Sequence, residues 1–285
     1  MRPPNLITVP GDPIAGFLLA SVTLGNDEVD ILRVWPCLVS ALLLYVAGLI
    51  LNDCADAKED GRDRPERPIP SGKVSRCAAL WAGMVLGMAG MTVAKFAGDT
   101  AFSTAVLLAL LIVIYNFVAR RVRLLGAIVM GMCRGCSLLL GASAITLLSP
   151  LVITAAIGVC FYIMDVTRIA MDEAEGKVEQ RHAILPPMVL VLVFGMFHYR
   201  VAELKIVSVL LAVCSVAWTM YCTASLKKAN SGGDIPKQVG HLIRGQLLVQ
   251  ASFCAVADGV GLVASAGLLL LWPIGILLAR KFYAS

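Results

Sequence analysis

Long apolar runs alternate with short polar segments along the whole chain, and this alternation predicts its secondary structure. Most runs approach or exceed the roughly 20 residues that an α-helix needs to cross a bilayer. The first 13 residues contain four prolines, so we predict a short non-helical entry, with the first helix beginning near Ile14 or as early as Asn5. The apolar runs lie at 14–24, 32–51, 77–96, 101–118, 124–148, 151–171, 184–197, 206–226, 239–257 and 260–278.

The segment 239–257 differs from the other runs because it carries His241, Arg244, Gln246 and Gln250. If it crosses the membrane there are ten spans, and if it lies in the interface there are nine. In either case we predict an all-α polytopic transmembrane bundle, formed by residues 1–285 as a single domain.

The composition supports a membrane protein. Of the 285 residues, 59% are hydrophobic and 15% are charged, and the mean hydropathy is +0.83, which is more apolar than a soluble domain needs. The net charge of +5 comes from basic residues in the polar connections, so it fits the excess of basic residues on the cytoplasmic side of membrane proteins and does not suggest binding of nucleic acid. The first apolar run has no convincing cleavage site, and we interpret it as a retained helix.

Basic residues are distributed unevenly between the two sets of connections, and this predicts an orientation. Thirteen lie on the side of the N-terminus and four on the other side, so the N-terminal side is predicted to be cytoplasmic, in a cell inner membrane or an organelle membrane. The thirteen are Lys58, Arg62, Arg64, Arg67, Lys73, Arg76, Arg120, Arg121, Arg123, Lys177, Arg181, Lys227 and Lys228; the four are Arg33, Lys95, Arg200 and Lys205.

The polar segment 52–72, NDCADAKEDGRDRPERPIPSG, holds six acidic residues among interleaved Lys and Arg. Asn52, Asp56 and Asp60 recur every four residues, so on a helix they lie along one face. Carboxylates at the end of a membrane helix can hold a divalent cation. A solvated loop with surface ion pairs would also explain interleaved charges, but the regular spacing favours a functional site.

A second acidic segment lies at 162–182 on the same predicted side of the membrane. Asp165, Arg168, Asp172 and Glu175 are spaced three, four and three residues apart, along one helical face. Two such segments facing each other could hold Mg²⁺ together with substrate phosphates, and the nearby cations suit the remaining phosphate oxygens. A diphosphate head on an apolar tail is a prenyl diphosphate, and we therefore hypothesise a polyprenyl diphosphate substrate.

The first segment resembles the first motif of the UbiA superfamily of intramembrane prenyltransferases, in its Asn52-x-x-x-Asp56-x-x-x-Asp60 spacing and its Arg64–Gly72 tail. The run VMGMCRGCSLLLG and the C-terminal LLARKFY are similar to the EboC-like branch. The resemblance implies a bundle around a central cavity and transfer of a prenyl group to a small acceptor. The second motif departs from the family pattern, with Arg168 where Tyr is common and Gly176 at the usual last acid.

The resemblance also implies roles for individual residues. Catalytic roles fall to Asn52, Asp56, Asp60, Asp172 and Glu175, of which Asp56, Asp60, Asp172 and Glu175 would hold Mg²⁺. The diphosphate contacts would be Arg67, Lys177, Arg134 and Arg168, with Asp53 and Asp165 as supporting groups. An isoprenoid-binding or transport protein on the same bundle is the alternative. The acceptor stays open among an aromatic ring, a quinone precursor, a cyclitol and a tetrapyrrole.

Two further features lie in the run 124–148. Arg134 lies in mid-span, where a charge is costly and usually faces the interior of a bundle. The glycines of this run, Gly131, Gly135 and Gly141, are expected to permit close helix packing and to have no chemical role.

Overall fold

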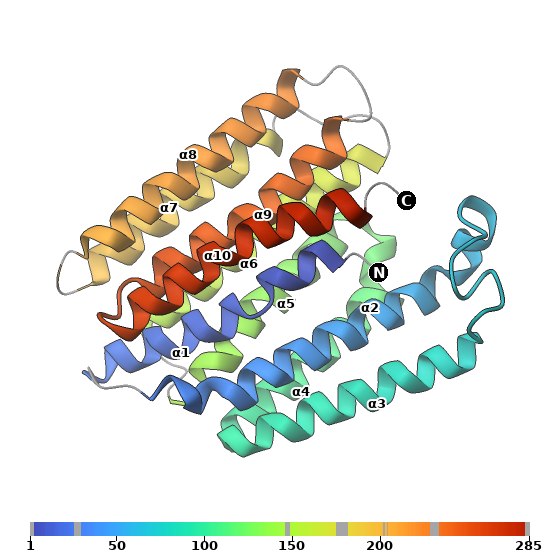
Figure 1. The fold of residues 1–285 in the computed structure, drawn as a ribbon, viewed down its shortest axis with the longest axis horizontal. Coiled ribbons are helices and arrows are strands. Elements are labelled where there is room, and N and C mark those ends of the chain that lie inside the picture. The colour runs from blue at the N-terminus through green and yellow to red at the C-terminus, as the bar shows by residue number, and fades with distance from the viewer. Residues whose placement is uncertain are drawn as a thin grey trace.

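A computed structural model shows the chain as a bundle of α-helices (Figure 1). It describes residues 3–25, 30–145, 149–174, 182–201, 203, 205–228 and 234–282. Within these ranges the chain forms ten α-helices and no strand, which confirms the all-α prediction. The helices are α1 (Gly11–Thr23), α2 (Trp35–Asp63), α3 (Arg76–Ala94), α4 (Asp99–Phe117), α5 (Arg123–Ala142), α6 (Pro150–Ala174), α7 (Leu185–Arg200), α8 (Ile206–Lys228), α9 (Asp234–Cys254) and α10 (Val260–Phe282).

Three predicted boundaries differ from the structure, one of them the end of α2, which lies at Asp63 and not at Leu51. The N-terminal entry is not irregular, because residues Pro3–Thr8 form the 3₁₀ helix η1 and α1 begins at Gly11. Proline is compatible with the first turns of a helix, where its missing N–H would have no intrahelical partner. Helix α5 ends at Ala142, several residues before the predicted Leu148. The backbone N–H groups of Ala144 and Ile145 then donate to carbonyls three residues earlier, a tighter turn that ends the helix.

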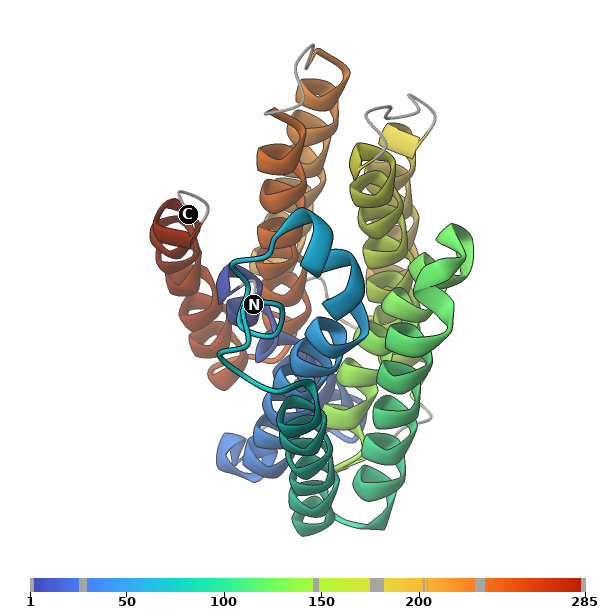
Figure 2. The same cartoon turned by 90° about the vertical axis from the view of Figure 1, so that its right-hand side faces the viewer.

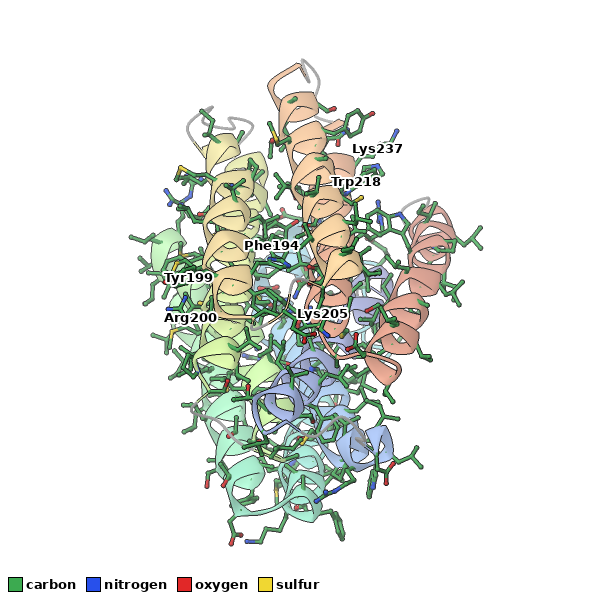
Figure 3. All side chains as sticks on the ribbon, turned by 90° about the vertical axis from the view of Figure 1, so that its left-hand side faces the viewer. Phe194, Tyr199, Arg200, Lys205, Trp218 and Lys237 are labelled. Atoms are coloured by element: carbon green, nitrogen blue, oxygen red, sulfur yellow. The ribbon has the colours of Figure 1, made fainter. Side chains whose placement is uncertain are left out.

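The helices have the length and surface of membrane spans. Within the described ranges, eight helical stretches are long and apolar enough to cross a bilayer, the first of them formed by η1 and α1 together. On the outer face of α7 and α8 the side chains of Val191, Leu192, Leu210 and Val213 are all more than half exposed, a surface that suits lipid and not water. In Figure 3, Lys205 lies near the lower end of these helices and Lys237 near the upper end of α9, with Phe194 between them. The chain is therefore an integral multi-pass membrane protein.

Helix α9 fails the apolar criterion for a span but lies where a span would lie. It is 21 residues long and runs lengthwise between α8 and α10 (Figure 1). Its polar Gln246 and Gln250 are buried among other helices and do not face the outside. The choice between nine and ten crossings stays a prediction.

Helices α1 and α5 join the two sides of the bundle. One core cluster unites buried residues of α1, α2, α4 and α5, and the other unites α1 and α5 with α6 to α10. In Figure 1, α2 to α4 accordingly lie on one side of α1 and α5, and α7 to α10 on the other.

Glycine lets these central helices approach closely. A Cβ added at Gly141 of α5 would lie 1.8 Å from the backbone oxygen of Pro13 in α1, and one added at Gly131 would lie 2.3 Å from that of Cys160 in α6. One added at Gly135 would lie 2.9 Å from the oxygen of Ala156. The prediction that these three glycines serve packing is confirmed.

Candidate active site

The first acidic segment begins inside a helix, and only its part after Asp63 leaves the helix. Helix α2 is 29 residues long and continues through its polar last turns to Asp63, two residues before Pro65. Its regular hydrogen bonding places Asn52, Asp56 and Asp60 along one face, as the spacing predicts. The amide nitrogen Nδ2 of Asn52 donates to Oδ2 of Asp56 over 2.7 Å, so the first two members of the face are in direct contact.

Arg120 approaches this face from another part of the chain. It lies in the 3₁₀ helix η4 (Ala119–Arg121), directly after α4, and its Nη1 forms an ion pair with Oδ1 of Asp56. Its Nη2 lies 3.6 Å from Oε2 of Glu59. Both partners of the Arg120–Asp56 pair are about four-fifths buried, so this pair is shielded from water more than a surface pair. The sequence analysis did not assign Arg120 to the acidic site, because contact with anionic lipid explains a basic corner at 120–123 equally well.

Arg67 contacts the other end of this face. Its Nη1 donates to Oδ2 of Asp60 over 2.7 Å, and Asp60 is buried to 7% exposure although it lies near the end of the helix. Arg67 reaches back because the segment after α2 folds into successive turns, in which Ser71 N donates to Arg67 O and Val74 N to Pro68 O. Figure 2 shows this segment crossing the end of the bundle.

A second contact anchors the return of the chain. Nε of Arg76, the first residue of α3, donates to the carbonyl oxygen of Cys54 over 3.0 Å. Ser75 caps α3, since its side chain accepts from the backbone N–H of Ala78. The structure thus fixes both ends of the connection that carries Arg67.

The second acidic segment is described only in part. Asp165 and Arg168 lie on α6, with Asp165 buried and Arg168 half-buried. The backbone of Asp172 lies in the last turn of the same helix, but its side chain lies outside the described residues, and so do Glu175 and Lys177. The roles assigned to these residues stay predictions.

Asp53 and Arg134 are the remaining expected residues. Asp53 lies beside the helical face of Asn52, Asp56 and Asp60 (the Asn52 face), and Arg134 lies apart from it. Asp53 is a half-buried neighbour of Asn52 on α2. Arg134 is buried in α5, and its Nε lies 3.1 Å from Oδ2 of Asp12 in α1, so an internal carboxylate already faces this guanidinium.

The side chains of the Asn52 face fit Mg²⁺ by their chemistry. Among the described residues no group of three or more His, Cys, Asp or Glu side chains is close enough to hold a metal ion. Mg²⁺ needs no such group, because it is usually held by one or two carboxylates, with water and substrate phosphates completing its coordination. Asp56 and Asp60 supply two carboxylates, and each is paired with an arginine, a residue type that binds phosphate oxygens well.

Comparison with known protein families decides the affiliation of the chain. The model of the UbiA prenyltransferase family matches residues 14–233. The chain belongs to the UbiA prenyltransferase family. The matched region of this UbiA family member includes both acidic segments, Arg120 and Arg134, and it ends before α9 begins.

Curated relatives of this UbiA family member are digeranylgeranylglyceryl phosphate synthases. The protein of Methanoregula boonei is 37% identical over 114 residues, which cover 40% of this chain and 39% of the relative. That of Methanothrix thermoacetophila is 28% identical over 176 residues, covering 61% and 63%. The match therefore spans less than two thirds of either relative. That of Methanoculleus marisnigri is 25% identical over 204 residues, covering 70% and 71%.

Two solved structures share the fold. A structure described as concerning digeranylgeranylglyceryl phosphate synthase in membranes superimposes with a TM-score of 0.61 at 20% identity, covering 89% of this chain and 96% of the other. A UbiA homologue from Aeropyrum pernix K1, in its apo form, gives a TM-score of 0.60 at 18% identity, covering 88% and 97%. At these identities the likeness establishes the fold alone.

Proposed function

We propose that this UbiA family member is a membrane prenyltransferase that transfers a prenyl group from a polyprenyl diphosphate to a small acceptor. One observation carries the proposal: Asp56 and Asp60, at the end of a membrane helix, are each paired with an arginine that comes from outside that helix. Alternating carboxylates and guanidiniums at one end of an apolar bundle suit a polar diphosphate head whose tail lies among the helices.

The residues of the proposed site divide into two roles. Asp56 and Asp60, with Asn52 beside them, would hold Mg²⁺, and Asp172 and Glu175 are proposed to add ligands from the second segment. Arg67 and Arg120 would bind phosphate oxygens, with Arg168 and Lys177 proposed from the second segment. When bound, Mg²⁺ neutralises charge on the leaving diphosphate.

The reaction balances without a redox partner. The allylic C–O bond of the prenyl diphosphate breaks, and its electron pair leaves with the diphosphate. A nucleophilic atom of the acceptor forms the new bond to the prenyl carbon and releases a proton. Arg67 and Arg120 stabilise the charge that develops on the diphosphate, and the apolar interior of the bundle, in which we propose a central cavity, keeps water from the cationic prenyl group.

The names of the relatives direct the choice of acceptor. A digeranylgeranylglyceryl phosphate is a glyceryl phosphate that carries two geranylgeranyl groups, so we propose a lipid with a glyceryl phosphate head as the first acceptor to test. The aromatic, quinone-type, cyclitol and tetrapyrrole acceptors form the rest of the panel.

The deciding experiment uses the full chain purified in detergent. Geranylgeranyl diphosphate labelled in its prenyl group is incubated with Mg²⁺ and each acceptor, and both diphosphate release and labelled product are measured. We expect acceptor-dependent release that EDTA abolishes and Mg²⁺ restores. Tight retention of the labelled lipid without release under every condition would support the alternative of an isoprenoid-binding or transport protein and overturn the enzyme.

Arg120 provides a sharper test of the site. Arg120→Ala is expected to raise KM for the prenyl diphosphate by about 10-fold or more, because a charge-assisted contact to a phosphate oxygen contributes about 1.5–3 kcal/mol. The matched control is Arg121→Ala, which removes the exposed neighbouring arginine. Equal effects of the two changes would show that only the general positive charge of this corner matters.

We also propose that the acidic ends face the cytoplasm. The last turns of α2 with the chain up to Arg76, and the corner 120–123 after α4, lie at the same end of the bundle (Figure 2), and together they carry nine of the thirteen basic residues of that side. A membrane-impermeant thiol reagent should label the exposed Cys77 of α3 only in inside-out vesicles. Labelling in right-side-out vesicles would reverse the orientation.

A further inference from the structure

The first membrane span is broken in its first half. The apolar stretch Asn5–Thr23 is long enough to cross a bilayer, but η1 ends at Thr8 and α1 begins at Gly11. Pro10 and Pro13 have no N–H, so they cannot donate to the carbonyls of Leu6 and Val9, and Thr8, the last residue of η1, lies between these two positions. Inside a membrane such a break is tolerated only where other groups of the protein satisfy the freed backbone.

Side chains from two other helices satisfy the carbonyl at the break. The backbone oxygen of Thr8 accepts from Nη2 of Arg134 in α5 over 2.9 Å and from Nε2 of Gln250 in α9 over 2.8 Å. Nη2 of Arg134 also lies 3.2 Å from the Thr8 hydroxyl oxygen. All three residues are buried, so water does not compete for these bonds.

Asp12 joins the same cluster just after the break. It lies in the first turn of α1, where the helix dipole favours a negative charge, and it is fully buried. Its Oδ1 accepts from Nε2 of Gln250 over 2.6 Å and from Nε2 of Gln246 over 3.0 Å. Its Oδ2 lies 3.1 Å from Nε of Arg134, in an ion pair whose angles fall short of a directed hydrogen bond.

We propose that Thr8, Asp12, Arg134, Gln246 and Gln250 form a clamp that fixes the break, and that Arg134 is a positioning residue and not a ligand of the diphosphate. Arg134 lies within the family-matched region, whereas the other four lie before or after it. Arg134 therefore holds the N-terminal segment directly, and Gln246 and Gln250 of the C-terminal segment join the clamp through Asp12.

The clamp also determines where η1 lies. Ile7 packs against α10, so closely that a Cβ added at Gly275 would lie 2.2 Å from its Cδ1. The N-terminus and the acidic end of α2 lie toward the same end of the bundle (Figures 1 and 2). This inference rests on the proposed transferase function only where it concerns turnover. There we expect η1 to line one side of the reaction site, and the clamp to set the orientation of η1.

A buried ion pair is a costly way to hold helices together, and this makes the clamp testable. Removing one partner leaves an uncompensated buried charge, whereas replacing both partners together removes that penalty. The neutral pair Asp12→Asn with Arg134→Gln keeps an acceptor for the two glutamines and a donor for Thr8 while removing both charges. A ligand of diphosphate, by contrast, needs its positive charge whatever happens at Asp12.

The experiment compares D12N, R134Q and the double variant D12N/R134Q in the full chain, with R200Q at an exposed arginine of α7 as control. Turnover of labelled prenyl diphosphate is measured beside hydrogen–deuterium exchange of the amides of residues 3–12. We expect each single variant to lower kcat/KM at least about 10-fold and to raise exchange selectively in residues 3–12. The double variant should recover both to within about threefold of the parent chain.

Two results would overturn the clamp. One is a double variant with exchange like that of the parent chain but with turnover still lost, because the charge of Arg134 would then act on the substrate. The other is exchange in residues 3–12 that R134Q leaves unchanged. If single variants fail to fold, the double variant decides alone. If even the parent chain turns over no substrate, the transferase proposal fails, while the exchange measurement still tests the clamp.

Discussion

Asp56→Ala is expected to lower diphosphate release by at least about 100-fold, the largest effect of any single change on activity. Asp56 lies at the centre of the Asn52 face, where it accepts from Asn52 and pairs with Arg120. Its loss removes a proposed Mg²⁺ ligand and leaves Arg120 without its principal carboxylate. One electrostatic group that stabilises developing charge commonly contributes a factor of about 10²–10³, and 100-fold corresponds to about 2.7 kcal/mol.

Asp63→Ala is the matched control for this prediction. Asp63 is an acid on the same helix, one turn beyond the face and exposed, so its removal should change release by less than about threefold. Asp60→Ala should resemble Asp56→Ala, since Asp60 is buried and holds Arg67. Unchanged turnover in Asp56→Ala and Asp60→Ala would show that the first acidic segment is not the site of chemistry.

The regular parts of the molecule could be predicted because they depend on local pattern. Hydropathy locates all ten helices, and the four-residue spacing correctly predicts that Asn52, Asp56 and Asp60 share one helical face. The apolar run 32–51 places α2 but not its end, because the helix continues beyond the run to Asp63, just before Pro65. Each of these inferences uses residues within a few turns of one another.

The partners of the charged residues could not be predicted because they come from distant parts of the chain. Arg120 and Asp56 are brought together only by the packing of α4 against α2. Asp12 meets Arg134 and Gln246 across gaps of more than 100 residues, and it lies in an entry that its prolines make look irregular. A single sequence shows that Arg134 is costly in mid-span but not which carboxylate compensates it.

Gly141→Ala is expected to have the largest effect on folding. The added methyl group would lie 1.8 Å from the carbonyl oxygen of Pro13, and a backbone atom cannot move aside as a flexible side chain can. The same crossing is tight from the other side, because a Cβ at Gly16 of α1 would lie 1.9 Å from the oxygen of Leu138. We expect a loss of about 3 kcal/mol or more in the free energy of unfolding.

The measurement follows thermal unfolding in detergent by the reactivity of buried thiols such as Cys37 and Cys254, which become accessible only when the bundle opens. Gly87→Ala is the control, because nothing lies within 4 Å of a Cβ added at this position of α3. It should leave stability unchanged or raise it by up to about 1 kcal/mol, since alanine favours a helix over glycine. Similar unfolding temperatures for both variants would contradict a close α1–α5 contact.

The α1–α5 contact matters for the clamp as well, because Pro13 directly follows Asp12. A forced separation of α1 from α5 at Gly141 would also pull Asp12 away from Arg134.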